Sequence, residues 1–212
     1  MASWQPVSVT VKICGLTNIG DARSAIDAGA DALGFVFYEH SPRFLELAKA
    51  ASLTAQLPAG VSRVGVFVDP EPALVLAAIA QCGLNILQFH GQETPEFCTQ
   101  FGVMSMKAFR IKDATSLEQL PEYQTDAWLL DSYHPGMPGG TGHRFNWALA
   151  REANRYNKPF FLAGGLTPDN VAEAVSTVHP FGVDVSSGVE SSPGQKDVAK
   201  VKAFIAAVRA AE

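Results

Sequence analysis

Cys14 and Asp131 are the side chains of this sequence best placed to exchange protons with a ligand. Cys14 ends a short apolar run and Gly15 follows it directly, while Asp131 comes straight after Trp128-Leu129-Leu130. A thiolate beside cations that bind phosphate can act as a base, and a carboxylate at the tip of an apolar strand is poorly explained as solvated surface. Two alternatives stay open here. Cys14 can be a small buried hydrophobe, and Asp131 can start a loop by accepting backbone hydrogen bonds.

Glycine-rich turns follow three consecutive apolar runs in the last third of the chain. They are Gly139-Gly140-Thr141-Gly142, Gly164-Gly165 and Ser186-Ser187-Gly188. Glycine lets a backbone approach a ligand closely, and a helix that starts nearby adds the positive end of its dipole. Three such turns in successive units indicate a site for a phosphorylated ligand, although turn geometry alone could also explain the glycines.

Arg43 and His90 are two further candidates for binding a ligand. Arg43 follows Ser41-Pro42 just after the second predicted strand, and an arginine there can pair with a carboxylate through two parallel hydrogen bonds. His90 lies in Gln88-Phe89-His90-Gly91, where it can donate to a substrate or satisfy a loop carbonyl. His134 and His143 share the long loop after Asp131, but the histidines form no pattern typical of a metal site.

Strand and helix patterns alternate along the whole chain, with eight of each. The predicted strands cover residues 9–14, 32–37, 62–68, 84–89, 103–109, 127–131, 159–163 and 181–185. Helices are predicted at 18–28, 45–57, 70–83, from 94, 113–120, 146–156, 167–175 and 197–211. This alternation predicts a parallel sheet, and late glycine turns with no early GxGxxG favour a compact (β/α)8 barrel over an open doubly wound sheet. Such barrels carry their active sites at the carboxyl ends of the strands.

Length and composition bound the remaining possibilities. The 212 residues predict one domain over 1–212, and 47% apolar content is ordinary for a globular protein. A net charge of −5 argues against nucleic acid as a partner, and no apolar run approaches a membrane span. Three widely spaced cysteines argue against disulfides and structural zinc, so we expect a reducing, cytoplasmic compartment without a signal peptide. The sequence leaves open whether the protein is a monomer or a homodimer.

The chain resembles the phosphoribosylanthranilate isomerases of tryptophan biosynthesis over nearly its whole length. The matching motifs are Val11-Lys12-Ile13-Cys14-Gly15-Leu16-Thr17, Phe35-Val36-Phe37 with Ser41-Pro42-Arg43, Val64-Gly65-Val66-Phe67-Val68, Leu87-Gln88-Phe89-His90-Gly91, Leu129-Leu130-Asp131-Ser132, Gly139-Gly140-Thr141-Gly142, Leu162-Ala163-Gly164-Gly165-Leu166-Thr167-Pro168-Asp169-Asn170-Val171 and Val183-Asp184-Val185-Ser186-Ser187-Gly188-Val189-Glu190. The resemblance implies a (β/α)8 isomerase that converts N-(5-phosphoribosyl)anthranilate to 1-(2-carboxyphenylamino)-1-deoxyribulose 5-phosphate by an Amadori rearrangement.

The resemblance also implies roles for single residues. Asp131 becomes the general acid and Cys14 the general base, and we expect a nearby cation or helix terminus to lower the pKa of Cys14. Arg43 is implied to face the anthranilate carboxylate, and His90 to lie near the substrate. Phosphate contacts are implied, mainly through backbone N–H groups, for Gly140, Thr141, Gly142, Gly164, Gly165, Ser187 and Gly188. Because the reaction only moves protons within one sugar, neither a metal nor an organic cofactor is expected.

Four rival functions fit parts of this sequence. The related histidine-pathway isomerase typically uses paired aspartates, whereas the first strand here ends in Cys14. Indole-glycerol-phosphate synthase and the tryptophan synthase α type need other catalytic sets, for which Lys12, Lys107 and Glu190 leave a narrow opening. A catalytically silent phosphosugar-binding barrel has no reason to keep both Cys14 and Asp131.

Overall fold

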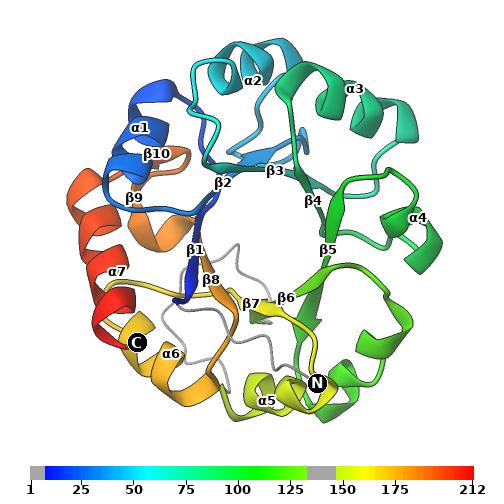
Figure 1. The fold of residues 1–212 in the computed structure, drawn as a ribbon, viewed down its shortest axis with the longest axis vertical. Helices are drawn as coiled ribbons and strands as arrows, with labels where there is room; N and C mark the ends of the chain where they lie inside the picture. Colours follow the sequence, from blue (N-terminus) through cyan, green and yellow to red (C-terminus); the bar gives the residue numbers. More distant parts are fainter. Residues whose placement is uncertain (1–7, 133–146) are drawn as a thin grey trace.

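The protein folds as a closed barrel of eight parallel strands, as predicted. The structure is a computed structural model, and it describes residues 8–132 and 147–212. Each strand pairs with the next along the chain, and β1 closes the barrel on β8 with Lys12 beside Asp184 (Figure 1). The strands are β1 (Thr10–Ile13), β2 (Ala32–Val36), β3 (Ser62–Phe67), β4 (Ile86–Phe89), β5 (Met104–Ile111), β6 (Ala127–Ser132), β7 (Phe160–Leu162) and β8 (Gly182–Val185).

In the described part of the chain, seven α-helices lie outside this ring (Figure 1). They are α1 (Ile19–Asp27), α2 (Leu47–Thr54), α3 (Pro72–Cys82), α4 (Pro95–Thr99), α5 (Trp147–Glu152), α6 (Val171–Val178) and α7 (Val198–Ala210). Local chemistry fixes several of their ends. The side chains of Asn18 and Thr94 accept hydrogen bonds from the first turns of α1 and α4, and Gly83 ends α3 in a left-handed conformation.

The prediction of a helix over residues 113–120 is wrong. Two 3-10 turns follow β5 instead, η1 (Ala114–Leu117) and η2 (Leu120–Glu122). Asp113 and Ser116 form a reciprocal capping box around η1, and Pro121 has no N–H with which to continue an α-helical ladder. The predicted helix over 146–156 is likewise shorter, because α5 gives way to a third 3-10 turn, η3 (Ala153–Tyr156).

The helix predicted from residue 167 begins later, at Val171. Asn170 explains the delay, because its Oδ1 accepts from the Thr167 N–H at 2.8 Å and its Nδ2 donates to the Gly165 carbonyl at 3.0 Å. These bonds hold residues 165–170 in a turn rather than in the first turn of α6. The glycine pair Gly164-Gly165 therefore precedes a loop and not a helix N-terminus.

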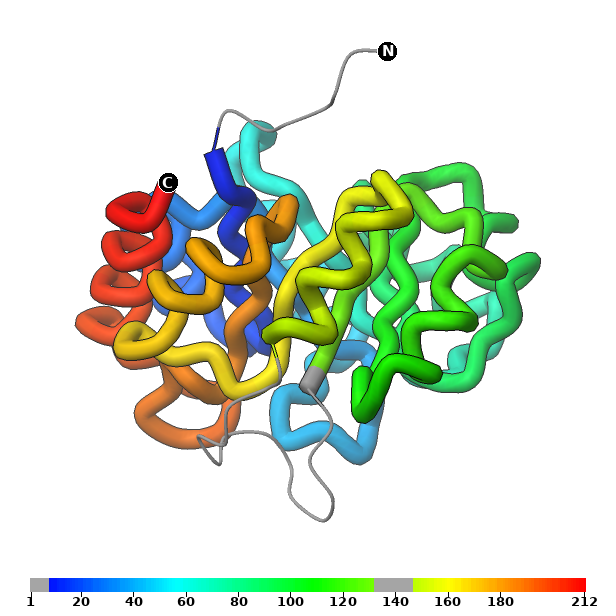
Figure 2. The backbone as a smooth tube through the Cα atoms, turned by 90° about the horizontal axis from the view of Figure 1, so that it is seen from below, coloured from blue at the N-terminus to red at the C-terminus, as the bar shows by residue number. Residues whose placement is uncertain are grey.

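A small antiparallel pair after β8 was not predicted. A 3-10 turn, η4 (Ser187–Val189), leads into β9 (Glu190–Ser192), which pairs with β10 (Gln195–Lys196). Figure 2 shows this segment, in orange, at the same end of the barrel as the light-blue segment that follows β2. That end is where the strands finish, so the extra pair adds side chains to the mouth of the barrel.

Strand side chains alternate between two apolar layers. Val64, Met106, Leu129 and Phe161 fill the interior of the barrel, while strand residues such as Leu130 pack outward against the helices. Because of this alternation, two residues that are two positions apart in a strand point toward the same face of the sheet. Among the described residues, no helix has the length and apolar character to cross a membrane.

Candidate active site at the strand ends

Cys14 and Asp131 both lie on the inner face of the barrel, at its carboxyl end. Cys14 follows Lys12 by two positions and Asp131 follows Leu129 by two, so each shares the inward direction of its neighbour. Cys14 is 7% exposed, and the Asp131 side chain is 27% exposed. In the order of the barrel, β7 and β8 lie between the strands that carry them. The two predicted catalytic residues therefore flank two of the three predicted phosphate loops, those after β7 and β8.

The thiol of Cys14 lies above a buried ion pair. Lys12 Nζ is 2.8 Å from Asp184 Oδ1, and the lysine side chain is wholly buried. Burial raises the pKa of Cys14; the Lys12 charge and its hydrogen bond oppose this effect, and the Asp184 carboxylate adds to it. The net shift is upward, so the expectation of a lowered pKa is wrong. Burial outweighs the nearby cation because Asp184 already neutralises much of the lysine charge.

Gly34 makes room for this thiol on the neighbouring strand. A Cβ atom at position 34 would lie 2.7 Å from Cys14 Sγ, closer than such atoms approach in proteins. The Cys14 N–H donates to the Val185 carbonyl at 2.8 Å, which ties the residue to β8 on its other side. The position of the thiol is thus fixed by β2 and β8 together.

Asp131 contacts His90 across the mouth. Asp131 Oδ2 is 3.3 Å from His90 Nε2, and Gln88 Nε2 is 3.1 Å from His90 Nδ1. The sequence singled out His90 as a binding residue, and the structure places it against the predicted acid. Gln88 was not singled out, although a glutamine in an apolar strand, two residues before a histidine, is a signal that inward alternation could have revealed.

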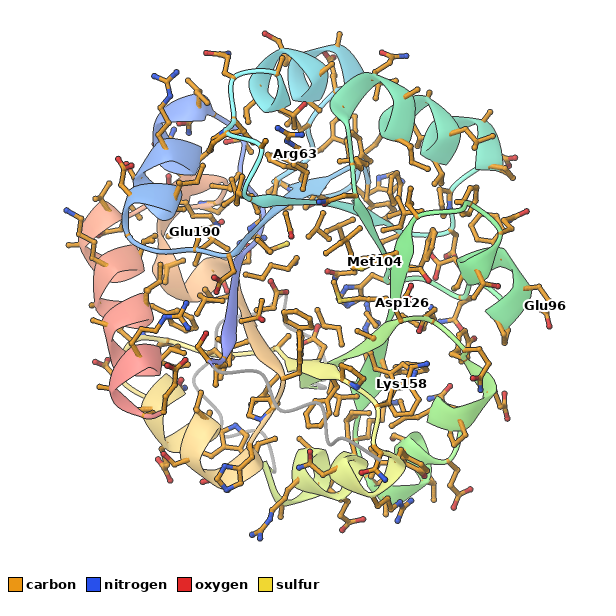
Figure 3. The ribbon with its side chains drawn as sticks, in the orientation of Figure 1. Arg63, Glu96, Met104, Asp126, Lys158 and Glu190 are labelled. Carbon is orange, nitrogen blue, oxygen red and sulfur yellow. The ribbon has the colours of Figure 1, made fainter. Side chains whose placement is uncertain are left out.

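Arg43 is held by a carboxylate of the protein itself. Its Nε and Nη2 lie 2.8 and 2.6 Å from the two carboxylate oxygens of Glu190, and Lys196 Nζ lies 2.8 Å from Glu190 Oε1. Burial alone would raise the pKa of Glu190, but hydrogen bonds from Arg43 and Lys196 outweigh it and hold the pKa below its usual value. Figure 3 labels Glu190 on the side of the barrel that carries β1.

The cluster of Arg43, Glu190 and Lys196 was not predicted from the sequence, which treated Arg43 as a ligand-binding residue without a protein partner. Among the residues that the structure describes, Arg43 uses two of its five N–H groups on Glu190, which leaves the others for a ligand. Gly15 lies beneath it, because a Cβ atom there would lie 2.5 Å from Arg43 Cδ. The sequence named Glu190 only in connection with rival functions and gave Lys196 no role, because the β9–β10 pair that carries them has no clear sequence pattern.

The two described phosphate-loop candidates lie side by side. Gly164 and Gly165 have φ values of +84° and +67°, and a Cβ atom on Gly165 would meet no atom of the described residues within 4 Å. A Cβ atom on Gly188, by contrast, would overlap the Leu166 carbonyl oxygen. Ser187 and Gly188 in η4 therefore pack directly on the loop that follows Gly165. Gly140, Thr141 and Gly142 lie outside the described residues, as do His134 and His143.

Lys107 and Glu93 form a second buried ion pair, on the outer side of β5. Lys107 Nζ lies 2.7 Å from both Glu93 Oε2 and the Gly91 carbonyl, and Glu93 accepts from the Gly91 N–H. These bonds fix the backbone beside His90. Within residues 8–132 and 147–212, no three acidic, cysteine or histidine side chains cluster closely enough to hold a metal ion.

Comparison with known proteins agrees with this arrangement. Residues 11–207 match the family model for N-(5'phosphoribosyl)anthranilate (PRA) isomerase. The isomerase of that name from Geobacter sulfurreducens is 52% identical over 197 residues, which cover 93% of this chain and 97% of that protein.

Two solved structures extend the comparison to three dimensions. Phosphoribosyl anthranilate isomerase from Thermotoga maritima superposes with a TM-score of 0.91 at 40% identity, covering 95% of this chain and 99% of the other. A second isomerase structure holds reduced 1-(o-carboxyphenylamino)-1-deoxyribulose 5-phosphate; its TM-score is 0.87 at 38% identity, with the same coverage. The chain belongs to the PRA isomerase family, and its function is the isomerisation step that this family performs in tryptophan biosynthesis.

Proposed function

We propose that Cys14 is the general base and Asp131 the general acid in the isomerisation of N-(5'-phosphoribosyl)anthranilate. Asp131 gives a proton to the ribose ring oxygen as the bond from that oxygen to C1 breaks, which leaves a cationic imine. The Cys14 thiolate then takes the proton from C2, and the C2–H electron pair forms an enolamine that tautomerises to the ketone product. Each group acts once on an atom of the same sugar, so no redox partner is required.

A substrate phosphate held by the glycine loops would orient the sugar for both groups. The open space above Gly165 and the packed turn at Ser187 and Gly188 lie between the strands of Asp131 and Cys14. Backbone N–H groups can approach an anion closely where glycine leaves no side chain. This arrangement supports phosphate contacts from Gly164, Gly165, Ser187 and Gly188, and the sugar then extends between base and acid.

The carboxylate of the substrate fits the side of the mouth that carries Arg43. The unused N–H groups of Arg43 are donors to a second carboxylate, and Lys196 helps to balance the charge of Glu190. Glu190 fixes the plane of the guanidinium group before a ligand arrives, which lowers the entropy that binding has to overcome. We therefore propose that Arg43 binds the anthranilate carboxylate while it stays paired with Glu190.

We also place the protein in the cytoplasm as a soluble enzyme. Its three cysteines are free and buried, which fits a reducing compartment. Fractionation of the source cells with an antibody against the protein tests this placement, and recovery with the membranes would contradict it.

The observation that carries the assignment is the placement of Cys14 and Asp131 on either side of the β7 and β8 loops. The test is turnover of freshly prepared phosphoribosylanthranilate by the parent protein, Cys14→Ala and Asp131→Ala. Cys98→Ala and Asp126→Ala serve as matched controls, because Cys98 lies in α4 and Asp126 bonds the Ser105 N–H at the opposite end of the barrel. We expect turnover in the parent and the controls and loss by several orders of magnitude in the two site variants. Full activity in either site variant would overturn that residue's role, and turnover of the histidine-pathway ribonucleotide would widen the substrate range.

A further inference from the structure

Gln88 is a buried polar side chain that the isomerisation described above does not use. It lies on the inner face of β4, is 1% exposed, and has Val66 and Met106 as its register partners. Its Nε2 is 3.1 Å from His90 Nδ1, while its Oε1 is buried without a hydrogen-bond partner among the described residues. A buried amide with one unsatisfied end costs free energy, so such a group calls for a specific role.

Within the described part of the chain, Asp131 is the carboxylate that the ring of His90 contacts. Glu93 is paired with Lys107, and Asp69 Oδ1 accepts from the Gln92 N–H. Arg110 is the register partner of Asp131 on β5 and is exposed. Within residues 8–132 and 147–212, two groups bracket the ring of His90, the Gln88 amide at Nδ1 and the Asp131 carboxylate at Nε2.

The orientation of the Gln88 amide decides which nitrogen of His90 carries a proton. With Nε2 toward the ring, the amide donates to Nδ1, so the neutral ring carries its proton at Nε2 and donates it to an ionised Asp131. With Oε1 toward the ring, the amide accepts a proton held at Nδ1. Because the far end of the amide has no partner among the residues that the structure describes, a half-turn forfeits no second hydrogen bond there.

We propose that Gln88 and His90 form a proton store for Asp131, in which the Gln88 amide turns each time the His90–Asp131 pair gains or loses a proton. This inference rests on the proposed role of Asp131 as the acid. Gln88 and His90 are positioning residues, since both act on the substrate only through Asp131.

The proton store takes up one proton from water and releases one proton to the substrate in each cycle. When the pair gains one proton from water, the ring holds a proton at Nδ1, which Gln88 Oε1 accepts. A second proton is shared between His90 Nε2 and Asp131 Oδ2. When Asp131 protonates the ring oxygen of the substrate, the shared proton leaves with it. The N–H electron pair stays on His90 Nε2, and the neutral ring returns to its Nε2–H form after exchange with water.

Two substitutions at position 88 have opposite consequences if this is correct. Gln88→Glu supplies a group that accepts from Nδ1–H, so it favours the protonated pair and should move the alkaline limb of the kcat profile to higher pH. Gln88→Met supplies no acceptor and should move the same limb to lower pH. We expect each shift to be about one pH unit, a tenfold change in the protonated fraction on the limb. Gln92→Met, on the exposed part of the same loop, should leave the profile unchanged.

Nitrogen NMR of histidine-labelled protein tests the store without turnover. His90 is assigned as the signal lost in His90→Asn, and its two ring nitrogens are followed between about pH 5 and pH 9. We expect Nε2–H alone at the alkaline end in the parent protein, protons on both nitrogens at the acid end, and persistent Nδ1–H in Gln88→Glu. The proposal is overturned if His90 never gains Nδ1–H in the parent, or if both Gln88 variants lose kcat without opposite shifts.

The NMR titration and the turnover measurements distinguish the proposed proton store from the proposed role of Asp131 as the general acid. A parent protein that turns over substrate, with turnover lost in Asp131→Ala, establishes the acid whatever His90 does. If Asp131→Ala stays active while the NMR titration shows the Nδ1–H form, the pair exists but does not serve the reaction. Should a Gln88 variant fail to fold, the titration of the parent protein still decides the matter.

Discussion

The acidity of Cys14 is set by its burial and by three charges close to it. Burial of the thiol favours its protonated form, the Lys12 and Lys196 ammonium groups favour the thiolate, and the Asp184 carboxylate acts against it. Because the pKa is raised overall, the resting residue is a thiol at neutral pH. The thiolate needed to remove the C2 proton is therefore a minor species, and its fraction rises with pH.

Replacing Lys12 with methionine tests this balance. The Lys12→Met protein lacks the cation that favours the thiolate most strongly, so the rise of kcat/KM with pH should move to higher pH. We expect kcat/KM near neutral pH to fall about tenfold or more, as a shift of one pH unit would produce. The measurement is the pH profile of kcat/KM between about pH 6 and pH 10.

Asp184→Asn is the matched control for that experiment. It breaks the same ion pair but keeps a cation beside the thiol and removes the anion that opposes ionisation. The limb should move to lower pH or stay in place. Movement to higher pH in both variants would mean that loss of the ion pair, and not loss of the lysine charge, disturbs Cys14.

At the scale of single elements, the glycines of the two loops differ in what they require. Gly165 needs a positive φ and faces open space, whereas Gly188 lies against the Leu166 carbonyl oxygen with no room for a side chain. The first glycine keeps a surface clear for a ligand. The second lets η4 pack on the loop after β7.

Alanine at the two positions should separate these roles. Gly165→Ala should raise KM about tenfold or more, while its positive φ costs only about 1 kcal/mol of stability. Gly188→Ala should lower the free energy of unfolding by about 2 kcal/mol or more, because the loop must move. Thermal unfolding and KM for phosphoribosylanthranilate are measured on both proteins. A large drop in Tm for Gly165→Ala with unchanged KM would contradict the ligand role.

The elements that the sequence predicted well are those with strong local signals. All eight strands were found, because buried parallel strands appear as apolar runs such as Ala32–Val36. Capping residues and the glycine at position 83 placed several helix ends correctly. The errors occurred where a single side chain overrides the pattern: the Asn170 bonds delay α6, and Pro121 together with the Asp113 cap replaces a helix with 3-10 turns.

The sequence predicted those site residues that are polar and lie at the ends of predicted strands. Cys14, Asp131, Arg43 and His90 were identified in this way, and the structure brings His90 against Asp131. Glu190 and Lys196 could not be predicted as partners of Arg43, since their contacts cross 147 residues of chain or depend on a short strand pair. The raised pKa of Cys14 also depends on burial, which no local pattern reveals.

At the scale of the whole molecule, the amino ends of the strands carry stability rather than chemistry. Arg209 in α7 donates to the Val9 carbonyl, and it lies 2.9 Å from Asp31 Oδ2. Asp31 in turn accepts from the Val11 N–H at 2.8 Å. The last helix is thereby fastened to the first strand, at the end of the barrel away from Cys14.

Loss of this fastening should affect stability alone. Arg209→Met should lower the free energy of unfolding by about 1–2 kcal/mol, because it removes charge-assisted hydrogen bonds at a partly exposed position. We expect kcat/KM to match that of the parent, and exposed Arg23→Met to change neither quantity. Denaturant unfolding monitored by circular dichroism, together with steady-state kinetics, checks both expectations. A clear loss of kcat/KM would refute the separation of the two ends.

Alkaline pH should destabilise the protein through its buried thiols. Burial raises the pKa of Cys98 to about 12, against 9.0 for the unperturbed thiol. Above pH 9 the unfolded chain releases this proton while the folded protein keeps it, so stability falls as pH rises toward 12. At about pH 10.5 this effect of Cys98 lowers the free energy of unfolding by about 2 kcal/mol relative to neutral pH. Urea unfolding at neutral and alkaline pH, compared with Cys98→Ala, measures it, and an equal pH dependence in both proteins would show that Cys98 is not responsible.

The ion pair between Lys12 and Asp184 also bears on the order in which the chain becomes functional. Its partners are 172 residues apart, and the Cys14 N–H bonds to Val185 on the same closing strand. During synthesis, β1 is therefore made long before its partner strand β8. Until β8 is in place, Lys12 lacks its ion-pair partner and Cys14 lacks its hydrogen bond to Val185. Contacts of such long range form late, because the loop entropy must be overcome first. We therefore expect any folding intermediate that lacks β8 to be inactive, and catalysis to begin only once the barrel has closed.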